Sequence, residues 1–152
     1  MSKDWLLKGE PYNPTEEELK EWQGFVYVIT DDKGKMYVGQ KSFWKKVTRP
    51  PLKGKKNKRR GIAESDWRTY VGSSPRVQDI VEQRGMDSIR REILHFGKTK
   101  GDLSYLETKE QFNRDVLFDD KYHNEIVNCR IHKKHLSEKL RNDYRTHHRD
   151  QT

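Results

Sequence analysis

Apolar and polar residues alternate over two neighbouring segments of the chain, and this pattern predicts a β-hairpin. Segments 24–30 and 36–40 are rich in β-branched and aromatic residues, and a short glycine-containing turn separates them. Side chains alternate between the two faces of a strand, so Tyr37 and Gly39 share a face of the second strand. The pattern therefore places Tyr37 where it can approach Tyr27 of the first strand.

Helical spacing and capping residues predict most of the other elements. Ser74 can cap a helix that Pro75 begins, and Gly85 can end it. In chain order, we expect a short helix over 14–22, a helix over 75–84, a strand over 89–96, a long helix over 101–117, a short strand over 124–131 and a helix after His132 that frays into a basic tail.

These elements predict an α+β domain with a three-stranded, mainly antiparallel sheet flanked by helices. A hairpin alone is only marginally stable in water, so the strand from Ile89 is needed to complete the sheet. A chain of 152 residues has room for one ordinary domain. We expect an N-terminal segment with a short helix over 1–23, the domain over 24–131, and a basic C-terminal tail over 132–152.

A strongly basic segment from Lys45 to Arg60 interrupts this pattern. It contains nine Lys or Arg residues, two prolines and no acidic residue. Like-charge repulsion and the prolines predict a mobile inserted loop, for which a solvated linker is the alternative interpretation. An acid-free loop suits phosphate contact better than solubility alone. We expect contacts with nucleic acid from Lys45, Lys46, Lys53, Lys55, Lys56, Lys58, Arg59, Arg60 and Arg68.

The overall charge points to the same class of partner. The net charge of +8 and the pI near 9.5 favour a polyanion through counterion release, although charge alone does not separate DNA, RNA and a membrane surface. No window approaches the roughly 18–20 apolar residues that a membrane span needs, so we expect no membrane partner. The single Cys129 excludes an intrachain disulfide and a paired-cysteine metal site, which is typical of a reducing cytoplasm.

Two triplets in the predicted hairpin resemble the signature of a known nuclease superfamily. Phe25-Val26-Tyr27 and Tyr37-Val38-Gly39 are similar to the paired motif of the GIY-YIG nucleases. A helix, a strand, a helix with Glu107 and then Asn128 follow in the family's order. Segments 41–44 and 70–74 look most like the small freestanding Seg-like homing endonucleases of bacteriophages. The resemblance covers roughly 24–131 and implies a metal-dependent endonuclease that cleaves duplex DNA, in the host cytoplasm if a phage encodes it.

The resemblance also implies roles for individual residues. Phosphodiester hydrolysis needs a base for the attacking water, a cation for the developing charge, and help for the leaving oxygen. Glu107 is implied to bind one divalent ion, Mg²⁺ or Mn²⁺. Tyr27 is implied to be the base or to orient the water, and Tyr37 to bind the scissile phosphate or share the base role. Because a free phenol has a pKa near 10, Tyr27 needs a cationic neighbour to become phenolate, and Lys41 is the candidate.

The family also places an arginine on the helix after the second triplet, where the basic segment interrupts this chain. Arg49 is nearest in spacing, with Arg60 and Arg68 as rivals, and Tyr70 is the candidate for the residue that follows this arginine in the family. Asn128 is expected to order the site rather than to react.

Other interpretations remain open at this point. The tyrosines are also compatible with ordinary sheet packing, and Glu107 with a solvated helix face. A non-catalytic nucleic-acid-binding protein that keeps the fold, or a coating protein, would explain the charge. His132 and His135 share a helical spacing, but a zinc site needs further matched ligands, so a tail that touches phosphates is preferred. The oligomeric state, monomer or DNA-induced dimer, is left open.

Overall fold

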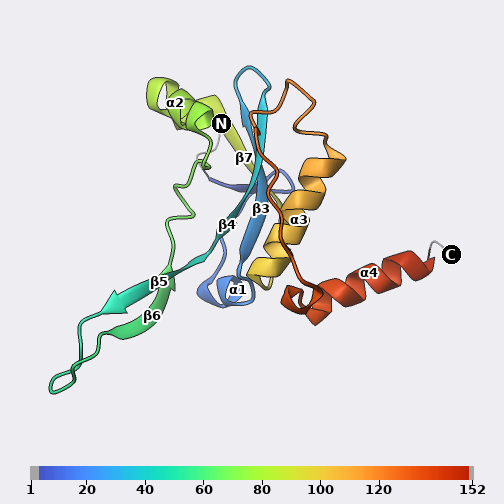
Figure 1. The fold of residues 1–152 in the computed structure, drawn as a ribbon. Helices are drawn as coiled ribbons and strands as arrows, with labels where there is room; N and C mark the ends of the chain where they lie inside the picture. Colours follow the sequence, from blue (N-terminus) through green and yellow to red (C-terminus); the bar gives the residue numbers. More distant parts are fainter. Residues whose placement is uncertain (1–3, 151–152) are drawn as a thin grey trace.

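A five-stranded sheet forms the centre of the protein. The computed structural model describes residues 4–150, with side chains over 4–145. The strands lie in the order β2-β1-β7-β3-β4, with β3 antiparallel to both of its neighbours and β1 parallel to β7. Figure 1 shows β7, β3 and β4 at the centre of the molecule. Their bounds are β1 (Leu6–Leu7), β2 (Glu10–Pro11), β3 (Gly24–Asp31), β4 (Met36–Ser42) and β7 (Ile89–Gly97).

The sheet confirms the predicted α+β class and hairpin but has two more strands than expected. The three predicted strands are the neighbours β7, β3 and β4, and the register places Tyr27 opposite Gly39. The additional strands β1 and β2 come from the N-terminal segment, where Lys8 and Gly9 turn the chain with positive φ. Trp5, which is 1% exposed, fixes this segment by donating its indole N–H to the Trp67 carbonyl over 2.7 Å. The N-terminal segment therefore packs into the core of the domain.

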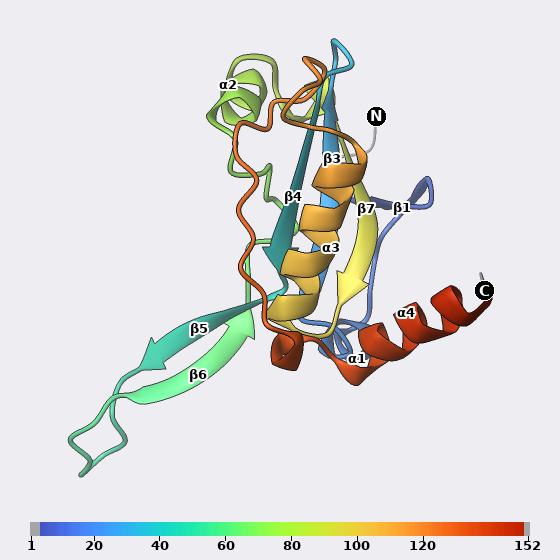
Figure 2. The ribbon, with the colours of Figure 1, turned by 45° about the vertical axis from the view of Figure 1, so that its right-hand side comes forward.

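Helices lie on both faces of the sheet, and each face has its own apolar core. The α-helices are α1 (Glu16–Lys20), α2 (Pro75–Arg84), α3 (Lys100–Asn113) and α4 (Glu138–Asp150), and the 3₁₀ helices are η1 (Met86–Ser88) and η2 (Lys133–His135). Figure 2 shows α3 along one face, where Leu103 and Leu106 pack against Val26, Val28 and Val38. The aromatic side chains of β3 pack on the other face with Trp5, Trp67 and Val77 of α2.

The predicted helices over 14–22, 75–84 and 101–117 are present as α1, α2 and α3, with α1 shorter at both ends and α2 at its predicted bounds. Thr15 caps α1 and accepts a hydrogen bond from the Glu18 backbone. α2 ends at Gly85, as predicted. α3 ends four residues earlier than expected because Asp115 adopts a positive φ of 51°, which a helix cannot continue.

The basic segment is a second hairpin, so the prediction of an irregular loop was wrong. Strands β5 (Trp44–Arg49) and β6 (Arg59–Glu64) pair in antiparallel register and project from the central sheet (Figure 1). At its base, the Trp44 indole donates to the Trp22 carbonyl over 2.9 Å, and Ser65 N–H donates to the Phe43 carbonyl over 2.7 Å. The two prolines lie in the connecting loop, where no strand hydrogen bond requires their missing N–H.

The predicted strand over 124–131 is absent, because a side chain replaces its backbone pairing. β4 is an edge strand, and the Asn124 side chain accepts from Val38 N–H over 3.0 Å and donates to the Val38 carbonyl over 2.8 Å. The chain thus runs along the β4 edge without a ladder of its own. Within the described residues, no helix has the length and apolar character needed to cross a lipid bilayer.

Candidate active site

The two signature tyrosines lie side by side on β3 and β4, as the sequence predicted. Their ring centroids are 6.4 Å apart, and the Tyr37 hydroxyl lies 2.8 Å from the Ser73 hydroxyl. Tyr27 is 1% exposed. Gly39 makes room for it, since a Cβ at this position would lie 2.5 Å from the Tyr27 hydroxyl oxygen. The absence of a side chain at Gly39 therefore allows Tyr27 to occupy its position.

A third tyrosine joins this pair, and Lys41 reaches it instead of Tyr27. The Tyr70 ring lies 6.1 Å from that of Tyr27, and Lys41 Nζ lies 4.2 Å from the Tyr70 ring centre. Lys41 also forms a 2.7 Å ion pair with Asp66. Tyr70, the candidate for the residue that follows the family's arginine, is thus part of the tyrosine cluster.

The expectation that Lys41 would favour a Tyr27 phenolate is wrong for the protein without bound metal or nucleic acid. Burial raises the pKa of Tyr27 well above its ordinary value, and Tyr70, Tyr37 and the negative charge of Glu107 raise it further. Burial also raises the pKa of Tyr37. Both side chains are therefore neutral phenols at neutral pH, suited to donating hydrogen bonds.

Glu107 approaches the tyrosines from α3 past the edge of β4. Gln111 Nε2 donates to Glu107 Oε1 over 3.1 Å and to the Val38 carbonyl over 3.2 Å, which ties the helix to the strand. Burial raises the pKa of Glu107, and the amides of Gln40 and Gln111 lower it in part. Because the charge of Glu107 raises the pKa of both Tyr27 and Tyr37, the three groups are within electrostatic reach of one another.

The chemistry of this carboxylate fits a magnesium-like ion. Glu107 is half-buried and forms no ion pair with any cationic side chain that the structure describes. Across the described residues, no three His, Cys, Asp or Glu side chains gather as a metal site, and this includes His132 and His135. Mg²⁺ commonly takes one or two carboxylates and keeps several waters beside substrate phosphates. A lone carboxylate fits that habit, whereas a zinc site needs more protein ligands.

The predicted arginines do not lie at the tyrosine cluster. Arg49 and Arg60 belong to the β5–β6 hairpin, and exposed Arg68 pairs with Glu64 over 3.2 Å. Sequence reasoning missed Arg76, in the first turn of α2, which lines a cavity of about 280 Å³ together with Tyr37. The basic hairpin separates the second triplet from this helix, so spacing pointed to the wrong residue. The Ser74-Pro75 start signal would have found it.

Asn124, rather than Asn128, is the asparagine that is buried beside Tyr37 and hydrogen-bonded to β4. Asn128 is exposed, whereas Asn124 is 7% exposed and bonds to both backbone groups of Val38. It also lines the cavity beside Tyr37 and Arg76. The predicted strand over 124–131 would not have indicated this contact, because the Asn124 side chain reaches the Val38 backbone from an irregular stretch of chain.

The predicted phosphate-binding residues are exposed, and most of them lie on the second hairpin. No acidic side chain among the described residues forms an ion pair with a hairpin cation. Arg59 donates to the Pro50 carbonyl. The residues concerned are Lys45, Lys46, Arg49, Lys53, Lys55, Lys56, Lys58, Arg59 and Arg60.

The tyrosine hairpin, the sheet order and the carboxylate on α3 together define a domain with the GIY-YIG fold. Residues 5–127 match the family described as "Putative endonuclease segE, GIY-YIG domain". This match spans well over half of the chain, so the protein belongs to that nuclease family, and its substrate class is nucleic acid. No curated protein and no solved structure matches the chain.

Proposed function

We propose that the protein is a metal-dependent endonuclease that hydrolyses phosphodiester bonds of duplex DNA, of the phage homing type. The observation that carries the proposal is the position of Glu107, a half-buried carboxylate with no described cationic partner, within electrostatic reach of two neutral tyrosines. The family match supports nuclease chemistry at this position.

Glu107, Tyr37 and Tyr27 have different proposed roles in hydrolysis. Glu107 would hold Mg²⁺ or Mn²⁺, which when bound neutralises charge that develops on the phosphate. Tyr37, next to the cavity that Arg76 lines, donates a hydrogen bond to a phosphate oxygen. Tyr27, with its raised pKa, stays protonated and orients the attacking water, whose proton passes to bulk solvent.

Arg76 supplies the fixed positive charge of the site. Its ion pair with Glu125 measures 3.4 Å between two exposed side chains, so a phosphate can displace the carboxylate at little cost. A guanidinium presents two parallel donors to phosphate oxygens, which suits the geometry of a backbone phosphate. Arg76 therefore replaces Arg49 as the proposed phosphate-binding arginine.

The β5–β6 hairpin is the proposed contact with duplex DNA outside the site. A two-stranded β-ribbon fits the major groove, and this ribbon carries unpaired cations along both strands and its loop. Each phosphate that it neutralises releases counterions and strengthens binding at low salt. The basic residues after His132 add to this positive charge.

Cleavage of supercoiled plasmid in the presence of Mg²⁺ tests the proposal. Glu107→Gln removes the charge but keeps the shape, and we expect nicking to fall by about 100-fold or more with DNA affinity unchanged. Glu82→Gln, which changes an exposed carboxylate on α2, should cleave like the wild type. Because burial raises the pKa of Glu107, nicking should increase as the pH rises through that value.

The opposite results point to a non-catalytic binding protein. If the wild type binds duplex DNA but cuts neither plasmid nor phage DNA with Mg²⁺ or Mn²⁺, the endonuclease proposal fails. Full cleavage by Glu107→Gln would retain a nuclease but remove Glu107 from its metal site.

A further inference from the structure

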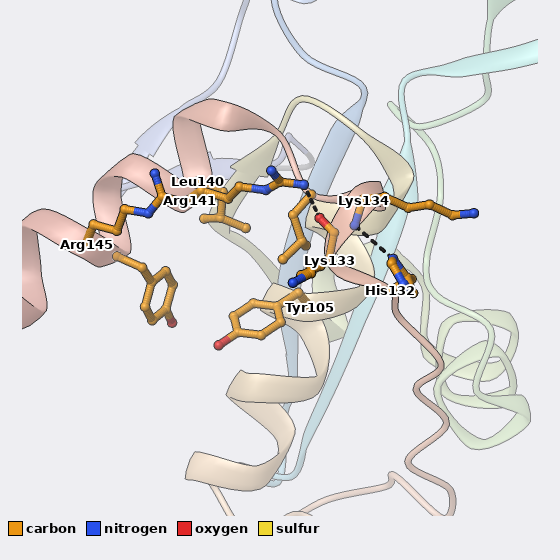
Figure 3. Close-up of a pocket in the computed structure, with 9 residues that line it drawn as sticks. Tyr105, His132, Lys133, Lys134, Leu140, Arg141 and Arg145 are labelled. Atoms are coloured by element: carbon orange, nitrogen blue, oxygen red, sulfur yellow. Dashed lines mark hydrogen bonds between the residues drawn. The ribbon is translucent and has the colours of Figure 1, made fainter.

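An open cavity of about 550 Å³ lies between α3 and the start of α4, and it shares no lining residue with the tyrosine site. Figure 3 shows Tyr105 of α3 facing the side chains of α4 across it. The rings of Tyr105 and Tyr144 meet edge to face, with centroids 5.6 Å apart and planes at 88°. Lys109 Nζ lies 4.2 Å from the centre of the Tyr144 ring and helps to hold it. Leu136 and Leu140 complete an apolar and aromatic wall.

Apart from His132, the rest of the lining is cationic. Lys133 and Lys134 come from η2, and Arg141 and Arg145 come from α4 (Figure 3). No carboxylate lines the cavity, and none of these four forms an ion pair with a described acidic side chain.

Arg141 adds a donor that lacks a partner. It donates through its terminal nitrogen to the Lys133 carbonyl, yet its Nε is buried without a hydrogen-bond partner in the part of the chain that the structure describes. A buried donor without a partner costs free energy. The cavity therefore combines aromatic surface with excess positive charge.

We propose that this cavity binds one nucleotide, with the base against Tyr105 and Tyr144 and the phosphate on Arg141, Arg145 and the η2 lysines. Base–tyrosine stacking tolerates any base, and guanidinium groups bind phosphate oxygens in pairs. The volume lies within the roughly 300–1,000 Å³ of small-ligand sites. The nucleotide is either free or one unit of a bound DNA strand; only the second source rests on the proposed function.

Calorimetric titration of the full chain with deoxyadenosine monophosphate tests the assignment. We expect the nucleotide to bind at least about tenfold more tightly than deoxyadenosine or inorganic phosphate, because each fragment uses half of the lining. Tyr144→Ala should weaken binding at least about tenfold, while Tyr144→Phe keeps the ring and the affinity. Lys139→Ala is the matched control, since Lys139 is an exposed cation of α4 that pairs with Asp143 and does not line the cavity.

Other results would overturn the assignment. Equal affinity for inorganic phosphate would show a simple anion site, and unchanged binding by Tyr144→Ala would remove the base from the cavity. A single-stranded oligonucleotide distinguishes a free nucleotide from one unit of a bound strand. If the oligonucleotide competes with the monophosphate, and Tyr144→Ala abolishes this competition, the cavity binds a strand unit. If it does not compete, the cavity binds only free nucleotide.

Plasmid nicking, measured in parallel, separates this inference from the proposed function. Nucleotide binding without any nicking by the wild type would sink the endonuclease proposal and leave the cavity assigned. Glu107-dependent nicking without nucleotide binding would do the reverse.

Discussion

Gly39→Ala should be among the most damaging single-atom additions to this protein. The new Cβ would lie 2.5 Å from the Tyr27 hydroxyl oxygen and 2.7 Å from Cζ, so the phenol must retreat by about 1 Å to reach an ordinary contact. The Tyr27 ring cannot easily move away, because its centroid lies 5.1 Å from that of Trp5 and 6.1 Å from that of Tyr70. Overpacking of a closed core costs about 1–3 kcal/mol.

Urea unfolding and plasmid nicking measure the two consequences. We expect the free energy of unfolding to fall by about 1–3 kcal/mol and the nicking rate to fall with it, since the displaced phenol no longer points to the strand edge. Tyr27→Phe removes the closest atom, so Gly39→Ala combined with it should cost less than the sum of the two changes. Wild-type stability and nicking in Gly39→Ala would refute the steric argument.

Three further predictions follow from the contacts of the edge strand and the second hairpin. Asn124→Ala leaves both backbone groups of Val38 without their side-chain partner and should lower the free energy of unfolding by about 2–3 kcal/mol, against almost no change for exposed Asn128→Ala in the same urea assay. Burial raises the pKa of Asp31, but hydrogen bonds from His123 and from the backbone of Lys35 and Lys33 lower it by more, so the pKa is lowered. The stability that ionised Asp31 contributes is therefore present above the ordinary Asp pKa and is lost as the pH falls through the lowered pKa. Asp31→Asn should therefore flatten the acid side of the stability profile, and an unchanged profile would contradict this. Replacing three hairpin cations by glutamine should weaken DNA binding and reduce the slope of log K against log salt by about 3, with Glu107-dependent nicking retained at saturating DNA; the three are Lys55, Lys56 and Lys58.

The sequence predicted the elements whose signals are local and sustained. The first hairpin extends over seven paired positions, and α2 has a proline at its start and a glycine at its end. β1 and β2 have two residues each and exist because β1 pairs with the distant β7. Two residues cannot show a period, so no reading of the chain along its length would have found them.

The basic segment was misjudged because composition was given more weight than alternation. Its cations repel one another, but Val47 and Ile62 are apolar positions typical of two paired strands. Trp44 fixes the first of these strands to the domain. Exposure to water and salt screens the repulsion, so backbone pairing prevails. The same misjudgement hid Arg76, since a hairpin can be inserted before α2 without moving that helix away from Tyr37.

The edge position of β4 explains why residues from both faces of the sheet meet at one place. An edge strand leaves backbone groups unpaired, and here Asn124 and Gln111 satisfy those of Val38. Gln111 uses its second amide hydrogen on Glu107, so the same side chain that closes the strand edge also fixes the carboxylate. Gly39, the next residue, lets the Tyr27 phenol approach this edge from the opposite face. The position of Glu107 relative to the tyrosines is thus set by the backbone of β4, and loss of Gln111 should disturb the site before it disturbs the fold.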